Sequence, residues 1–154
     1  MRTAEQWFEI YGASHRNPVN ERIHQVCIPL IVLSTLGLLQ AIPGPVPFEW
    51  VAAAGAMVFY LSLSWRLTLG LALGAAGVLA INHGISTMAP IGWVSGAIFV
   101  VAWIAQFVGH KIEGKKPSFF QDLLFLLVGP AWLLQAAYAG LGIPLHPGRA
   151  DTPG

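Results

Sequence analysis

Three histidines from distant parts of the chain are the residues whose type and position could carry chemistry. His15 precedes an expected helix start, His24 lies about two turns into that helix, and His110 ends a later apolar run. If these segments cross a membrane, as argued below, the three imidazoles lie at a similar depth near one face. An ionisable group at such a boundary is costly, so each one needs a reason. Neutral imidazole is a common ligand for zinc and iron, and the sequence therefore predicts a metal site.

Polar residues beside these histidines strengthen the metal interpretation. Asn17, Asn20 and Gln106 could orient metal ligands through hydrogen bonds. Glu113 lies three residues after His110, so both side chains can face the same way if the helix continues. The alternative is that each histidine is a boundary residue, bonded to backbone, headgroup or water. Three histidines at one depth, with amide side chains beside them, favour the metal site over this alternative.

His83 and His146 have a weaker claim to the same site. His83 follows Asn82 near the far end of an apolar run. If that run crosses outward, His83 lies some 25 Å from the other three, at about 1.5 Å per residue. It joins the site only if its helix is re-entrant or steeply tilted. His146 lies in a Pro-rich tail, and we expect it to have no role.

The composition indicates a membrane protein rather than a soluble domain. Of 154 residues, 55% are hydrophobic and only 10% are charged, against about 25% charged in an ordinary soluble domain. No charged residue occurs between Leu67 and Phe107. The net charge of +1 argues against a broad nucleic-acid-binding surface. The first 22 residues are rich in charge and lack an apolar core, so we expect no signal peptide.

The apolar runs predict an all-α protein, a polytopic transmembrane helical bundle of about five spans. Crossing the hydrocarbon core takes about 20 apolar residues as a helix. The runs are continuously apolar without alternation, which favours helices over a barrel. The candidate spans are 23–41, 48–65, 67–84, 91–109 and 120–141. We expect three parts: an interfacial segment (1–22), the helical bundle (23–141) and a flexible tail (142–154).

Lys and Arg predict how this bundle is oriented, because cytoplasmic loops are enriched in them. With five spans, seven of the eight basic residues fall on one side. These are Arg2, Arg16, Arg22, Arg66, Lys111, Lys115 and Lys116. Only Arg149 falls opposite. The N-terminus is therefore expected to be cytoplasmic and the C-terminus to lie across the membrane, with His15, His24 and His110 on the cytoplasmic side.

Two blocks of the sequence resemble the 2-hydroxy fatty acid dioxygenases. The first reads Tyr11-x3-His15-x-Asn17-Pro18-x-Asn20-x3-His24. The second reads Gln106-Phe107-Val108-Gly109-His110-x2-Glu113-Gly114-Lys115-Lys116-Pro117. The resemblance runs from about Tyr11 to Tyr138 in the same order and includes Gly129-Pro130, whereas 42–90 matches only in hydropathy. Both blocks are specific, and a chance match of the pair is not expected.

The resemblance implies a membrane-embedded Fe(II) dioxygenase that shortens a 2-hydroxy fatty acid by one carbon, using O2. His15, His24 and His110 match motif histidines and carry over as iron ligands, and Glu113 matches an acidic position and is a further candidate. His83 lies in the stretch that matches only in hydropathy, so the resemblance does not assign it and it stays a candidate from its residue type. Three imidazoles, or two with Glu113, would leave open positions on Fe(II) for the 2-hydroxy carboxylate and O2.

The charge pattern adds expectations about the substrate carboxylate and the location of the site. The basic residues that could attract the carboxylate are Arg16, Arg22, Lys115 and Lys116; the alternative is that they only follow the positive-inside rule. We expect a bacterial inner membrane, with the site at the cytoplasmic face, or the endoplasmic reticulum if the chain is eukaryotic.

Two other classes of function remain open from the residues alone. One is a non-catalytic metal- or haem-binding membrane protein, with His24 and His110 as axial haem ligands. The other is a zinc-dependent lipid hydrolase, because zinc and iron share imidazole ligands.

Overall fold

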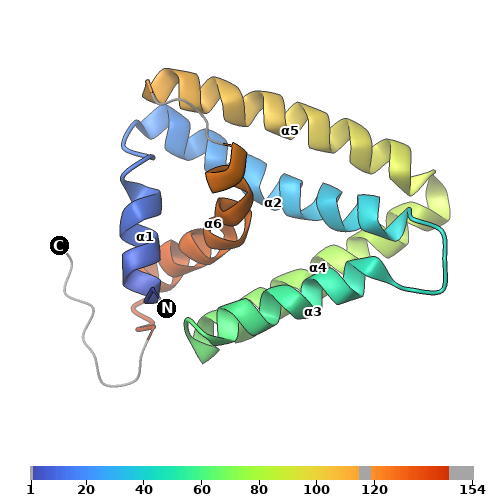
Figure 1. Cartoon of the computed structure of the whole chain (residues 1–154), viewed down its shortest axis with the longest axis horizontal. Helices are drawn as coiled ribbons and strands as arrows, with labels where there is room; N and C mark the ends of the chain where they lie inside the picture. Colours follow the sequence, from blue (N-terminus) through green and yellow to red (C-terminus); the bar gives the residue numbers. More distant parts are fainter. Residues whose placement is uncertain (1, 115–118, 146–154) are drawn as a thin grey trace.

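The structure, a computed structural model, describes residues 2–114 and 119–145 (Figure 1). Over these residues the chain forms helices and no strand, which confirms the all-α class. The helices are α1 (Ala4–Gly12), α2 (Pro18–Gln40), α3 (Phe48–Leu61), α4 (Trp65–Met88), α5 (Ile91–Glu113) and α6 (Phe119–Gly140).

Local sequence signals set the two helix ends that matter for the site. At the start of α2, the Asn17 side chain accepts a hydrogen bond from the Val19 N–H at 2.9 Å. Pro18 takes the first helical position, where a missing N–H costs nothing. The helix therefore begins five residues before the expected span. At the end of α5, Gly114 adopts a left-handed conformation with φ 74°, which glycine does without strain.

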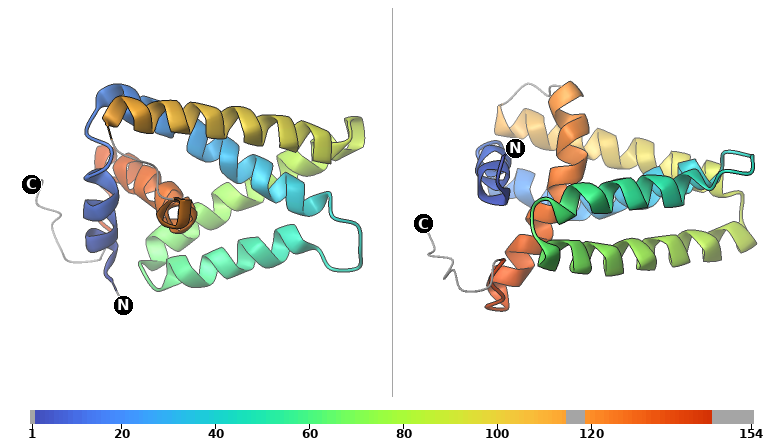
Figure 2. Two further views of the ribbon diagram at one scale, coloured as in Figure 1. Left: turned by 45° about the horizontal axis from the view of Figure 1, so that its top comes forward. Right: turned by 60° about the horizontal axis from the view of Figure 1, so that its bottom comes forward.

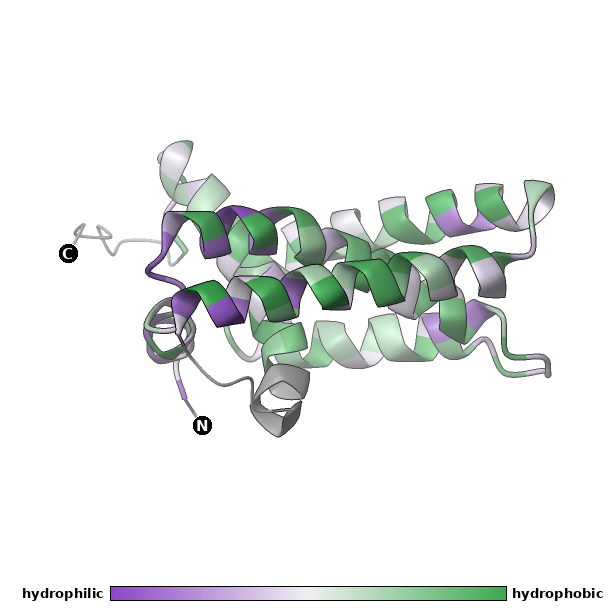
Figure 3. Cartoon of the chain, turned by 90° about the horizontal axis from the view of Figure 1, so that it is seen from above, coloured by the Kyte–Doolittle hydropathy of each residue, from purple (hydrophilic) through white to green (hydrophobic). Residues whose placement is uncertain are grey.

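Helices α2 to α5 run side by side and reverse direction at each turn (Figure 1). The start of α2, the α3–α4 turn and the end of α5 lie at one end of the bundle. The α2–α3 loop and the α4–α5 turn lie at the other, called here the far end. Hydrophilic residues gather at the first end (Figure 3), which we call the polar end, formed by residues 13–22, 62–66 and 109–114.

Three helices of the described part are long and apolar enough to cross a membrane, namely α2, α4 and α5. Helix α3 and the described apolar part of α6 are shorter. Large apolar side chains are exposed on the outer faces, including Val58, Leu73 and Trp93. Such a surface is unfavourable in water and suits lipid. The structure thus supports membrane helices, and the count of five spans stays a prediction.

Helix α6 takes a different course from the expected fifth span. It lies across the long helices near the polar end, in contact with α1, α2 and α4 (Figure 2). Small residues allow this crossing: a Cβ at Gly70 would overlap the Tyr138 hydroxyl, and a Cβ at Gly129 would lie 3.1 Å from Ile28 Cδ1. A helix that crosses in this way does not carry the chain back to the far end.

The chain after α6 therefore stays near the α3–α4 turn. Ser64 Oγ donates a hydrogen bond to the Leu145 carbonyl at 2.8 Å, and Arg66 Nη1 donates to the Pro144 carbonyl at 2.6 Å. The sequence prediction put the tail on the side opposite the N-terminus, whereas residue 145 lies at the polar end. Residues 146–154, with His146 and Arg149, lie outside the described part.

Helix α1 packs against α6, and the expectation that residues 1–22 lie at the membrane interface stays a prediction. Its Thr3 cap accepts a hydrogen bond from the Gln6 N–H, and the Gln6 side chain accepts one from the Thr3 N–H. Phe8 and Tyr11 are buried in one cluster with Val128 of α6. This packing fixes the position of the loop that follows α1 and carries His15.

Candidate metal centre

His15, His24 and His110 converge at the polar end of the bundle. They come from the loop before α2, from α2 and from α5, respectively. Their ring centroids are separated by 4.2 Å (His15–His24), 4.9 Å (His24–His110) and 5.8 Å (His15–His110). One ligand nitrogen from each ring lies within 4.8 Å of the other two. Two imidazole nitrogens that each lie about 2.0–2.1 Å from one zinc ion are at most about 4.2 Å apart, so the widest pair must move slightly closer to share one ion.

Hydrogen bonds to the backbone fix which nitrogen of two rings can bind a metal. Nδ1 of His15 lies 2.7 Å from the Tyr11 carbonyl oxygen, and Nδ1 of His24 lies 2.9 Å from the Asn20 carbonyl oxygen. A carbonyl oxygen only accepts, so Nδ1 carries the proton in both rings and Nε2 carries the lone pair. Metal-binding histidines are typically held by such a second hydrogen bond.

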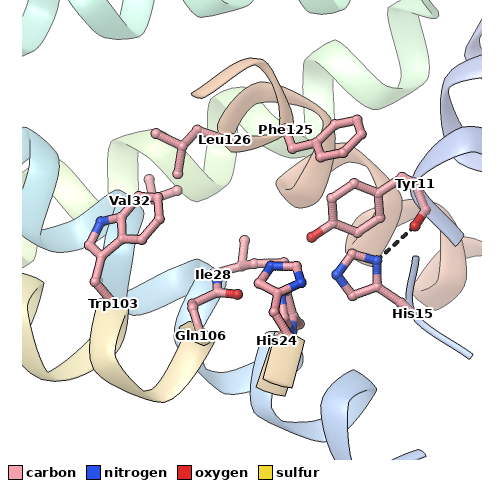
Figure 4. Close-up of a pocket in the computed structure, with 10 residues that line it drawn as sticks. Tyr11, His15, His24, Ile28, Val32, Trp103, Gln106, Phe125 and Leu126 are labelled. Carbon is pink, nitrogen blue, oxygen red and sulfur yellow. Dashed lines mark hydrogen bonds between the residues drawn. The ribbon is translucent and has the colours of Figure 1, made fainter. Parts of the chain in front are cut away.

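The pocket around the histidines has a largely apolar lining, to which α6 contributes Phe125 and Leu126. His24 is 2% exposed and His15 is 6% exposed, while His110 is half-buried. The Tyr11 ring stacks on the His15 ring at 4.2 Å with an interplanar angle of 14°. In Figure 4 the Tyr11 hydroxyl points toward the histidines. The residues that line the pocket are Tyr11, His15, His24, Ile28, Val32, Trp103, Gln106, His110, Phe125 and Leu126.

Glu113 lies beside the centre but faces the loop that carries His15. Its carboxylate oxygens accept hydrogen bonds from the Arg16 N–H at 3.0 Å, the Asn17 N–H at 2.9 Å and Asn20 Nδ2 at 3.0 Å. It is not part of the three-histidine group. The structure therefore places Glu113 as a link between the end of α5 and the loop before α2.

Asn20 joins this link to His24. Its side chain is fully buried, and Nδ2 also donates to the Ser14 carbonyl at 3.3 Å. Its backbone carbonyl accepts the His24 hydrogen bond described above. A Cβ at Gly109 would overlap Asn20 Oδ1 and lie 3.5 Å from His24 Cε1. Glycine at this position thus lets α5 approach closely enough to bring His110 to the other two histidines.

Gln106 and Asn17 were both expected to orient ligands, but only Gln106 lines the histidine pocket. Gln106 is buried and lines the pocket one turn before His110. Asn17 caps α2 and contacts Glu113 through its backbone. The pocket is also lined by three residues that were not predicted as site residues, namely Tyr11, Trp103 and Phe125. Only Tyr11 carried a signal, since it precedes His15 by four residues within the first block.

Three further candidates among the described residues, His83, Arg16 and Arg22, are not part of the three-histidine group. His83 is exposed on α4 and outside the histidine group. Its neighbour Asn82 donates to the Leu33 carbonyl at 3.0 Å, which places His83 about 13 Å along α2 from His24. Arg16 and Arg22 are exposed at the polar end. Lys115 and Lys116 lie outside the described residues.

The fold and site define a class: an all-helical protein with helices that can span a membrane and a buried three-histidine centre at one end. A family model described as "2-hydroxy-palmitic acid dioxygenase Mpo1-like" matches residues 1–141. The chain therefore belongs to the Mpo1-like family, which confirms the resemblance seen in the two blocks.

A curated relative comes from yeast. The Saccharomyces cerevisiae protein named 2-hydroxy-palmitic acid dioxygenase MPO1 is 28% identical over 125 residues, covering 77% of this chain and 69% of the yeast protein. No solved structure matches the chain.

Proposed function

We propose that this protein is an Fe(II)-dependent dioxygenase of the membrane that shortens 2-hydroxy fatty acids by one carbon. The observation that carries the proposal is the three-histidine group with ligand nitrogens within 4.8 Å of one another. The name of the yeast relative, a 2-hydroxy-palmitic acid dioxygenase, supports the substrate and the reaction class.

The donor set suits such a metal. The buried imidazoles of His15 and His24 each donate a hydrogen bond from Nδ1–H to a backbone carbonyl, which leaves Nε2 to bind a metal. His110 provides the third ligand nitrogen. Three neutral nitrogen ligands bind a divalent transition metal and leave positions open for substrate. Bound Fe(II) would supply the one-electron and O2 chemistry that side chains lack.

The reaction balances without an outside reductant. A 2-hydroxy acid and O2 give the acid shorter by one carbon, CO2 and water. The C1–C2 bond breaks, C2 becomes the new carboxyl carbon, and the substrate supplies all four electrons that O2 takes up. A dioxygenase of this type therefore needs no reductase partner.

The residues of the chain bind the substrate and exclude water. Gln106, buried beside His110, offers an amide donor and acceptor to the carboxylate or the 2-hydroxyl group. Ile28, Val32 and Phe125 form apolar walls that limit water around the reacting carbon. Arg16 and Arg22 raise the local concentration of carboxylates at the polar end.

The test compares two histidines of one chain. His24→Ala should lower bound iron and turnover of 2-hydroxyhexadecanoic acid by at least about a hundredfold, since a ligand is removed. His83→Ala, at an exposed site outside the centre, is the matched control and should keep both. Full iron and full turnover in His24→Ala would contradict the proposal. An oxygen-independent zinc activity or a haem absorption band would replace it with one of the two other classes.

A further inference from the structure

A second, apolar hollow opens beside the histidine pocket. It is lined by Thr35 of α2, Leu126 of α6, and Phe99, Val100, Trp103, Ile104 and Phe107 of α5. We call these seven residues the side groove. Trp103 and Leu126 line both hollows, so the groove adjoins the pocket. Figure 4 shows these two residues on the side of the pocket away from Tyr11 and His15.

The side groove runs from the histidines toward the far end. Phe99 precedes His110 by eleven residues on one helix, which corresponds to about 16 Å at 1.5 Å per residue. That is roughly half of the ~30 Å hydrocarbon thickness of a bilayer. The path from His110 to the far end of the groove thus has about the length that one acyl chain occupies within a single leaflet.

The outer wall of the side groove is exposed. Val100 is 55% exposed and Ile104 is 57% exposed among the described residues. Both belong to α5, a helix long and apolar enough to cross the membrane. A groove of this kind faces lipid rather than water, so a lipid substrate can enter sideways from the bilayer.

We propose that the side groove binds the acyl chain of the 2-hydroxy acid, and that Phe99 and Val100 at its far end limit chain length. The inference rests on the proposed function for the carboxyl end of the substrate. An acyl chain fits because the groove has an almost wholly apolar lining and adjoins, at Trp103 and Leu126, the pocket that holds the three histidines. A molecule with one polar end and a thin apolar tail can fill the histidine pocket and the side groove together.

The first test changes the groove and leaves the histidines alone. Val100→Trp fills the groove, and Val101→Trp places the same ring on the neighbouring residue, 66% exposed and outside the groove. Displacing even one methylene costs about tenfold or more in specificity. Val100→Trp should therefore lower kcat/KM at least about tenfold for 2-hydroxyhexadecanoic acid and leave 2-hydroxyoctanoic acid within about twofold. Val101→Trp should change neither.

Two results would overturn the proposal. One is unchanged kcat/KM for the long acid in Val100→Trp. The other is an equal loss for both acids in a Val100→Trp protein that keeps its full metal content.

A second test does not depend on turnover. A 2-hydroxyhexadecanoic acid with a photoreactive diazirine at its terminal carbon is bound without oxygen, irradiated, and its attachment sites are mapped by mass spectrometry. Labelling at Thr35 and residues 99–104 is expected, and labelling confined to the outer faces of α3 and α4 would overturn the proposal. Labelling of the groove in a protein that does not oxidise the acid would refute the proposed reaction but keep the binding site.

Discussion

The carboxylate of Glu113 accepts a hydrogen bond from the Asn20 side chain at 3.0 Å, so the last residue of α5 is joined to the first turn of α2. The same carboxylate accepts two backbone N–H groups from the loop that follows His15. Hydrogen bonds to a charged group are each worth about 1.5–3 kcal/mol. Glu113 therefore links the three segments that carry the histidines.

Glu113→Gln should weaken metal binding without abolishing it. The amide keeps one acceptor oxygen and loses the charge, and groups that orient metal ligands typically contribute about 10–100-fold to metal affinity. The metal dissociation constant of the purified protein checks this, with Glu21→Gln on the surface of α2 as the control. If Glu113→Ala lost metal as completely as His24→Ala, Glu113 would be a ligand rather than a positioning residue.

Gly109→Ala should destabilise the fold and disturb the centre. The added methyl meets Asn20 Oδ1, and overpacking of a closed core costs about 1–3 kcal/mol. Gly96→Ala on the same helix is the control, since no atom lies within 4 Å of the Cβ it adds. Thermal unfolding in detergent should show a lower midpoint only for Gly109→Ala. Equal midpoints for the two variants would mean that α5 does not approach α2 as described.

Tyr11 should support His15 mainly through its ring. Tyr11→Phe keeps the stack on the imidazole, whereas Tyr11→Ala removes it, and an aromatic pair is worth about 0.5–1.5 kcal/mol beyond its buried area. Tyr11→Phe is thus expected to keep its metal affinity, and Tyr11→Ala to lose up to about tenfold. Metal titration of both proteins measures the difference. Similar losses in the two variants would assign the effect to the hydroxyl.

The course of α6 predicts that both described ends of the chain lie on one side of the membrane. Leu145 is bonded to Ser64 at the polar end, where the N-terminal helix also packs. Single cysteines placed at Thr3 and Ile143, in a Cys27→Ala background, should react with an impermeant reagent from the same face of sealed vesicles. Reaction from opposite faces would support the five-span arrangement instead.

The convergence of His15, His24 and His110 could be predicted from the sequence, because apolar runs of membrane length set the depth of each histidine. The sequence left His83 open as a further candidate, and in the structure His83 is exposed and outside the histidine group. The contacts of Glu113 could not be predicted from the sequence. Its three-residue spacing from His110 gives the helix face of Glu113 but not the loop that packs against that face.

The course of α6 could not be predicted for a related reason. An apolar run over 120–141 fits a helix that crosses its neighbours as well as one that lies beside them. The choice depends on contacts such as Gly70 with Tyr138, which join residues far apart in sequence. Hydropathy alone does not report such contacts.

The central claim, an iron- and oxygen-dependent loss of C1 at the three-histidine centre, is tested most directly by isotope release. The substrate is 2-hydroxyhexadecanoic acid labelled at its carboxyl carbon, and the measured quantity is labelled CO2 from the iron-loaded protein. Release should require both iron and O2, be lost in His110→Ala and persist in His83→Ala. Release without O2, or undiminished release from His110→Ala, would contradict the account.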